Sequence, residues 1–228
     1  MPSWVEGEAR RANRNLLIVN GIIVVGVASV AVANLKDIDF SRDLWPLLIG
    51  ALLFLLALWN CIKAVRRYGE IQTTPVWKRL SVYGNTEQLS LEIEQQRLGP
   101  KTKYGNLELT GSWLVNKSLF STWVSPVADM AWVYKKVTKH SVNFIPTGKS
   151  YSIIIYGRHR QHLEVSVSSE KKANELLTDF STRVPWAIYG YDKELLAAWT
   201  KDPGSVIALV NSRYEQFKSR PSSASVSS

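Results

Sequence analysis

Three consecutive residues, Gly148, Lys149 and Ser150, have the types that end a phosphate-binding P-loop, in which backbone amides and a lysine hold the phosphates of a nucleotide. The full motif begins with a glycine five residues earlier, where this chain has Asn143, and it leads into a helix. Here the next residues are Tyr-Ser-Ile-Ile-Ile-Tyr, which is typical of a strand. We therefore expect Pro146–Gly148 to be a turn between two strands, and we expect no nucleotide or other cofactor.

Two of the three histidines, His159 and His162, lie in one short segment that we expect to be a hairpin turn. Histidines three residues apart can share a metal ion in some turns. Arg158 and Arg160 would repel a cation there, and neither a cysteine nor a carboxylate cluster joins them. We expect no metal site and no catalytic residue. An enzyme whose site a single sequence does not reveal is the least favoured alternative.

The formal net charge is +9, and basic residues are concentrated around two neighbouring predicted strands and their turns. The candidates for a headgroup-binding or partner-binding patch are Lys135, Lys136, Lys139, His140, Lys149, Arg158 and Arg160. Because side chains alternate along a strand, Lys136 and His140 should share one face and Lys135 and Lys139 the other. Two interpretations are open: a surface that binds anionic headgroups or a protein, and a merely solvated face. We expect no nucleic acid partner, since no DNA-reading motif is present.

Two apolar runs near the N-terminus predict transmembrane helices at about 16–33 and 44–62. Helices of about 18 residues nearly match the length of a hydrocarbon core of roughly 30 Å. A cleaved signal peptide is the alternative for the first run, but the run is longer than a typical signal region and no clear cleavage site follows it. We expect a membrane hairpin within 16–66, joined by a short connection at 34–43.

The flanks of this hairpin set its expected orientation, because lysine and arginine favour the cytoplasmic side. Basic residues lie on both outer flanks: Arg10, Arg11, Arg14, Lys63, Arg66 and Arg67. The connection has only two basic residues, beside three acidic ones. We expect an integral protein of the inner (cytoplasmic) membrane with both termini in the cytoplasm, including the flank at 1–15. The single cysteine, Cys61, lies in the second run and cannot form an intrachain disulfide.

The first predicted helix is rich in small residues, which allow transmembrane helices to pack closely. The candidates for this packing are Gly21, Gly26, Ala28 and Ser29. They would pack either against the second helix or against a partner, which is another membrane protein or a second copy of this chain.

The remainder of the chain predicts an α+β organisation. A juxtamembrane helical linker at 67–103, with a helix capped by Asn85, precedes a region with the apolar period of strands. The expected strands are Asn106–Thr110, Trp113–Asn116, Thr122–Pro126, Ala131–His140, Tyr151–Tyr156 and His162–Val167. Short connections favour one antiparallel sheet, and a helix capped by Ser168 or Ser169 should cover it.

Two C-terminal helices should complete a domain at 104–218. The last of them has a broad apolar stripe, which would dock either on the domain itself or on a partner. Residues 219–228 are too polar to order themselves and should form a disordered tail.

The segments Trp132–Tyr156 and Arg183–Trp199 resemble a poorly characterised bacterial domain family of unknown function, over about Asn106–Trp199. More loosely, the strand-rich unit with its closing helix resembles the pleckstrin-homology-like (PH-like) domains found beside paired transmembrane helices in bacteria. The resemblance implies a membrane-anchored module with an antiparallel sheet or barrel, and it transfers no catalytic residue.

From these observations we expect a noncatalytic binding module that engages a protein partner, anionic lipid headgroups or both at the inner membrane face. The alternative is an accessory structural subunit of a larger integral membrane complex.

Overall fold

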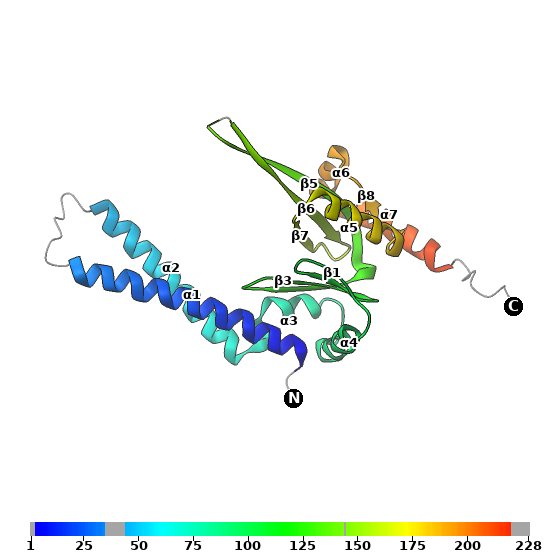
Figure 1. Ribbon diagram of the computed structural model, residues 1–228. Coiled ribbons are helices and arrows are strands. Elements are labelled where there is room, and N and C mark those ends of the chain that lie inside the picture. The colour runs from blue at the N-terminus through cyan, green and yellow to red at the C-terminus, as the bar shows by residue number, and fades with distance from the viewer. Residues whose placement is uncertain (1–2, 35–43, 144, 220–228) are drawn as a thin grey trace. The chain divides into compact units, whose positions relative to one another are not determined.

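A computed structural model describes residues 3–34, 44–143 and 145–219 (Figure 1). The chain divides into two units. The first comprises Met1–Gln95 together with Lys117–Trp123, and the second comprises Gln96–Asn116 together with Val124–Ser228. Nearly all of the predicted connection and of the predicted tail lies outside the described residues.

Two long helices form most of the first unit: α1, Trp4–Asn34, and α2, Leu44–Gly69. Both predicted helices are present, but each is longer than its apolar run. α1 begins well before the run because Val5, Ala9 and Ala12 recur at the spacing of one helical face and are buried. The N-terminal flank is therefore helical and packed.

The two helices are long and apolar enough to span a membrane, over Trp4–Val30 and Leu48–Gly69. Many of their large apolar side chains are exposed, including Ile22 on α1 and Leu52 on α2, which distinguishes them from the core helices of a soluble protein. The guanidinium of Arg10 lies 5.7 Å from the centroid of the Tyr68 ring. The basic start of α1 and the basic end of α2 are therefore neighbours.

Short helices follow α2: a 3-10 helix at Ile71–Thr73, α3 at Pro75–Leu80 and α4 at Thr86–Leu98. The predicted cap of α4 is confirmed, since Asn85 Oδ1 accepts hydrogen bonds from the backbone N–H groups of Glu87 (3.0 Å) and Gln88 (3.3 Å).

The strands form two sheets, where we expected one. The first has the order β1-β2-β3-β4, with β1 at Thr102–Tyr104, β2 at Leu107–Leu109, β3 at Trp113–Lys117 and β4 at Thr122–Pro126. The second has the order β7-β6-β5-β8, with β5 at Met130–Val142, β6 at Ile145–Gly157, β7 at His162–Val167 and β8 at Ile188–Tyr189. β5, β6 and β7 pair antiparallel, and β8 pairs parallel to β5.

The predicted turn at Pro146–Gly148 is wrong, because these residues lie within β6. β5 ends at Val142, and Asn143 has a positive φ of 49° at the true turn. The pairing register shifts after His140, which leaves one extra residue on β6. Such a bulge accommodates the proline and glycine that suggested a turn.

Three helices complete the second unit: α5 at Glu170–Arg183, α6 at Lys193–Lys201 and α7 at Pro203–Ser219. Ser169 caps α5 by accepting a hydrogen bond from the N–H of Lys172 at 3.3 Å, as predicted. The stripe on α7 docks within its own unit, since the rings of Tyr214 and Phe217 lie 4.9 and 5.2 Å from that of Trp186.

Candidate functional site

A basic two-stranded ribbon extends from the second sheet. We define the arm as residues 136–142 and 145–150, the outer half of the β5–β6 hairpin. β7 pairs with β6 only over Tyr151–Tyr156, and β8 pairs with β5 only at Trp132 and Val133. The arm therefore projects beyond the strands that flank its base (Figure 1). Every arm residue whose side chain is described is exposed.

Lys139 and Lys149 are directly opposite each other in the ladder of the arm. Opposite residues of an antiparallel pair present their side chains on the same face, with Cβ atoms about 5 Å apart. Within the described ranges, no hydrogen bond or ion pair is found for either lysine, and Lys149 acts on a carboxylate only through its electrostatic effect on Glu170. Two positive charges thus share one exposed face of the arm.

The predicted alternation of the other lysines is confirmed. Lys135 Nζ donates to Glu170 Oε1 (2.7 Å) and Asn174 Oδ1 (3.0 Å), both on α5. Lys136 Nζ instead lies 3.3 Å from a carboxylate oxygen of Glu164, on β7. The hydrogen bond and the charge of Lys135 lower the pKa of Glu170 below its ordinary value, with a smaller contribution from Lys149.

The seven predicted patch residues do not converge on one surface. His140 shares the face of Lys136, and its Nε2 lies 2.9 Å from Ser150 Oγ. Arg158 lies apart from the arm, where it stacks 4.4 Å from the Tyr214 ring centroid and donates to Asn211 of α7 at 3.1 Å. Arg160 occupies the β6–β7 turn with a positive φ of 59°. Of the seven residues, only Lys139 and Lys149 form an exposed pair. They lie on the face of the hairpin that carries Lys135, whose partners are on α5.

The histidines of the β6–β7 turn do not face a common ligand. His159 Nδ1 lies 2.6 Å from Asp129 Oδ1, and its backbone N–H donates to the same oxygen at 3.2 Å. Asp129 is only 2% exposed, and a Cβ at Gly157 would collide with its Oδ2. This carboxylate therefore fixes the turn. Across the described ranges, no group of three histidine, cysteine or acidic side chains could hold a metal ion.

Aromatic rings anchor the base of the hairpin. The Trp132 ring is fully buried and lies 4.7 Å from that of Tyr134 and 5.1 Å from that of Tyr156, centroid to centroid. Trp132 Nε1 also donates to the carbonyl of Gly190 at 2.8 Å. Burial raises the pKa of Tyr134, so this hydroxyl stays neutral. The inner half of the hairpin is therefore part of the core.

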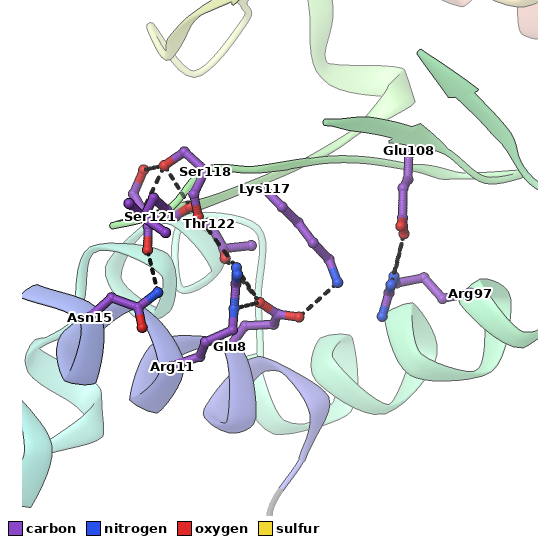
Figure 2. Close-up of polar contacts among 10 residues, drawn as sticks. Glu8, Arg11, Asn15, Arg97, Glu108, Lys117, Ser118, Ser121 and Thr122 are labelled. Atoms are coloured by element: carbon purple, nitrogen blue, oxygen red, sulfur yellow. Dashed lines mark hydrogen bonds and ion pairs between the residues drawn. The ribbon is translucent and has the colours of Figure 1, made fainter. Parts of the chain in front are cut away.

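A second polar cluster lies within the first unit, around Glu8 of α1 (Figure 2). The Glu8 carboxylate accepts from Lys117 Nζ at 2.7 Å and from Arg11 Nε at 2.8 Å. Only 11% of the Glu8 side chain is exposed. About two helical turns after Glu8, the Asn15 amide donates to the carbonyl of Leu119 at 2.9 Å. The start of α1 is therefore tied to the loop that follows β3.

Figure 2 also shows an ion pair of the second unit, between Arg97 and Glu108. Arg97 Nε and one terminal nitrogen each lie 2.8 Å from the same oxygen of Glu108. The two side chains are 14% and 11% exposed. This shielded pair holds the end of α4 against β2 and leaves little of either charge for a ligand.

The small residues of α1 that we named as packing candidates are mostly exposed. Gly21 is half-buried, whereas Gly26, Ala28 and Ser29 are exposed. A Cβ added at Gly21 or Gly26 would meet no described atom within 4 Å. These glycines therefore do not mark a close helix crossing within the hairpin, and packing against a partner stays a prediction.

Sequence reasoning missed the shielded carboxylate of Glu8 and the buried carboxylates of Glu108 and Asp129. The sequence does contain a signal near Glu8. Val5, Ala9 and Ala12 recur at helical spacing before the apolar run and are buried, which indicates a packed helix that includes Glu8. Asp129 carries no comparable signal, because its partners lie 28 and 30 residues further along the chain.

Comparison with known proteins gives a family without an assigned activity. Residues 102–199 match the family model described as a domain of unknown function (DUF6709). This DUF6709 domain begins at β1, ends within α6 and includes the whole arm. It covers less than half of the chain. No curated protein and no solved structure matches the sequence.

Proposed function

We propose that this chain is a noncatalytic binding module, anchored in a membrane by α1 and α2, whose arm engages anionic lipid headgroups, a protein partner or both. The observation that carries the proposal is the exposed pair Lys139 and Lys149 on a ribbon that projects from its sheet. No acidic residue lies between Met130 and Leu163, so the carboxylates that pair with the ribbon come from α5 and β7, where Glu170 binds Lys135 and Glu164 binds Lys136. At a membrane, each basic side chain near an anionic surface contributes about 1 kcal/mol.

The proposed placement puts both termini and the DUF6709 domain in the cytoplasm, beside the inner membrane. Support comes from the shared end of the hairpin: Arg10 contacts Tyr68, and basic residues lie on both flanks there. Two antiparallel-rich sheets with a covering helix are compatible with a PH-like domain, which we retain as the proposed architecture. The parallel strand β8 and the two last helices exceed a minimal domain of that kind.

The test is retention of lipid and protein by the full chain, extracted from native membranes in a gentle detergent and analysed by mass spectrometry. Lys139→Gln combined with Lys149→Gln should release the bound anionic lipid or protein. Lys171→Gln combined with Lys172→Gln is the matched control, because both lysines are exposed on α5 of the same unit and the change in net charge is equal. If both double variants lose the bound lipid or protein to the same extent, the loss reflects net charge alone. That result would contradict a binding role for the arm.

A second candidate function is an accessory structural subunit of a larger membrane complex. The exposure of Gly26, Ala28 and Ser29 on α1 favours it, since small residues allow a partner helix to approach closely. In the same extraction, a stoichiometric protein that survives the lysine substitutions but is lost on Gly26→Leu would support this function over the first.

A further inference from the structure

The last residue pair of the arm's ladder is apolar, whereas its basic residues, Lys139 and Lys149 among them, lie further back along the ribbon. Val142 and Ile145 pair with each other at the end of the ladder. Their side chains are 62% and 67% exposed, among the larger values for apolar side chains outside α1 and α2. The two side chains are adjacent at the end of a projecting ribbon, where an apolar phase can reach them without burying the rest of the domain.

The lysines lie at a fixed distance behind this tip. Lys139 precedes Val142 by three residues and Lys149 follows Ile145 by four. At about 3.3 Å per residue, the ammonium-bearing positions lie roughly 10 Å from the tip along the ribbon. Amphipathic elements bury their apolar side about 5 to 10 Å into the boundary between headgroups and acyl chains. The spacing places apolar side chains at acyl depth when the lysines reach the phosphates.

We infer that the tip of the arm, Val142 and Ile145, inserts into an anionic lipid surface while Lys139 and Lys149 bind the phosphates around it. This inference rests on the proposed function and names its ligand. Along the ribbon, the apolar pair comes first and the two lysines lie behind it. This matches the order of acyl chains and headgroups in a leaflet. A second copy of the arm is a poor occupant, because two acid-free ribbons would repel each other.

The experiment follows the depth of the tip directly. The full chain with Cys61→Ser has no native cysteine, so a nitroxide label can be attached at Ile145→Cys alone. The labelled chain is placed in nanodiscs of phosphatidylcholine with or without phosphatidylglycerol, and accessibility to oxygen and to a water-soluble nickel chelate is measured by electron paramagnetic resonance. Leu209→Cys gives the control label, because Leu209 is 48% exposed on α7 of the same unit.

We expect the label at residue 145 to gain oxygen access and lose nickel access only in the anionic discs, while the label at residue 209 stays in water. Adding Lys139→Gln and Lys149→Gln should lower the ratio of inserted to free arm about fivefold per lysine. A label at residue 145 that remains as accessible to nickel as the control in both kinds of disc would overturn the insertion.

Lipid retention in the same nanodiscs distinguishes headgroup binding by the lysines from insertion of the tip. If anionic lipid is still enriched around the chain and the lysine substitutions release it, headgroup binding stands and insertion alone fails. If neither enrichment nor a change in depth occurs, both fail. A label that leaves water only when a co-extracted protein is present would overturn insertion in favour of protein docking.

Discussion

Basic side chains are held differently in the two units. In the first unit, Lys117 and Arg11 both donate to Glu8, whose carboxylate is largely shielded from water. In the second unit, Lys139 and Lys149 face each other on an exposed ribbon, with no ion pair among the described residues. Each pair contributes two charges to the same formal net charge of +9.

The difference shows that net charge alone identifies no binding surface. A shielded carboxylate needs its cations, since a buried charge without a partner is strongly destabilising. Two lysines opposite each other in water instead repel and weaken the ribbon that holds them. Stability accounts for the first arrangement. It does not account for the second, for which we propose an anionic ligand.

The largest effect on stability should follow the loss of the Glu8 carboxylate. Glu8→Gln leaves Lys117 and Arg11 with one neutral acceptor in a shielded place, so we expect the free energy of unfolding to fall by about 2 kcal/mol. Thermal unfolding in detergent, followed by tryptophan fluorescence, measures the change. Glu70→Gln is the control, because Glu70 is exposed in the same unit and its change should stay within about 0.5 kcal/mol.

A double-mutant cycle separates this pairing from a general loss of charge. The cost of Glu8→Gln should be clearly smaller when Lys117→Met is already present, since the two residues contact each other. Costs that simply add would mean that Glu8 and Lys117 do not stabilise each other.

The arm itself could be predicted in outline from the sequence, but its turn could not. The bounds of β4 and β7 agree with the prediction, because alternating apolar residues between turn signals define them well. Pro146 and Gly148 gave a strong local turn signal, yet the long ladder from Met130 to Gly157 overrides it through a register shift. The residues around a turn do not show how far two strands pair with each other, because that depends on contacts distant in the sequence.

The strands that were missed, β1 and β8, are short and depend on their neighbours. β8 has two residues and pairs parallel to β5, far from it in sequence. No periodicity can identify so short a segment, because packing alone holds it. For the same reason, the seven basic candidates could be named from the sequence, but the stacking of Arg158 on Tyr214 of α7 could not be predicted.

An intermediate effect is expected at Lys135, which lies where the arm meets its base. Lys135→Met should raise the pKa of Glu170 toward its ordinary value of 4.5, because the hydrogen bond that lowers it is lost. The lowered pKa means that the pair stabilises the fold above pH 4.5 and loses this contribution as the pH falls through the pKa of the folded state. Side-chain carbon NMR of labelled glutamate measures the titration. Lys136→Met, on the opposite face, should leave it unchanged.

The smallest effect on stability belongs to the residues with the largest proposed effect on binding. Lys139→Gln removes one of two like charges directly opposite in the ladder, so we expect the free energy of unfolding to rise by a few tenths of a kcal/mol. The same thermal unfolding assay measures it, and Lys171→Gln on α5 is the control. A substitution that stabilises the fold while it weakens lipid retention marks a residue whose place is set by function. A clear loss of stability would instead make Lys139 a structural cation, like Lys117, and would remove the contrast on which the arm's proposed role rests.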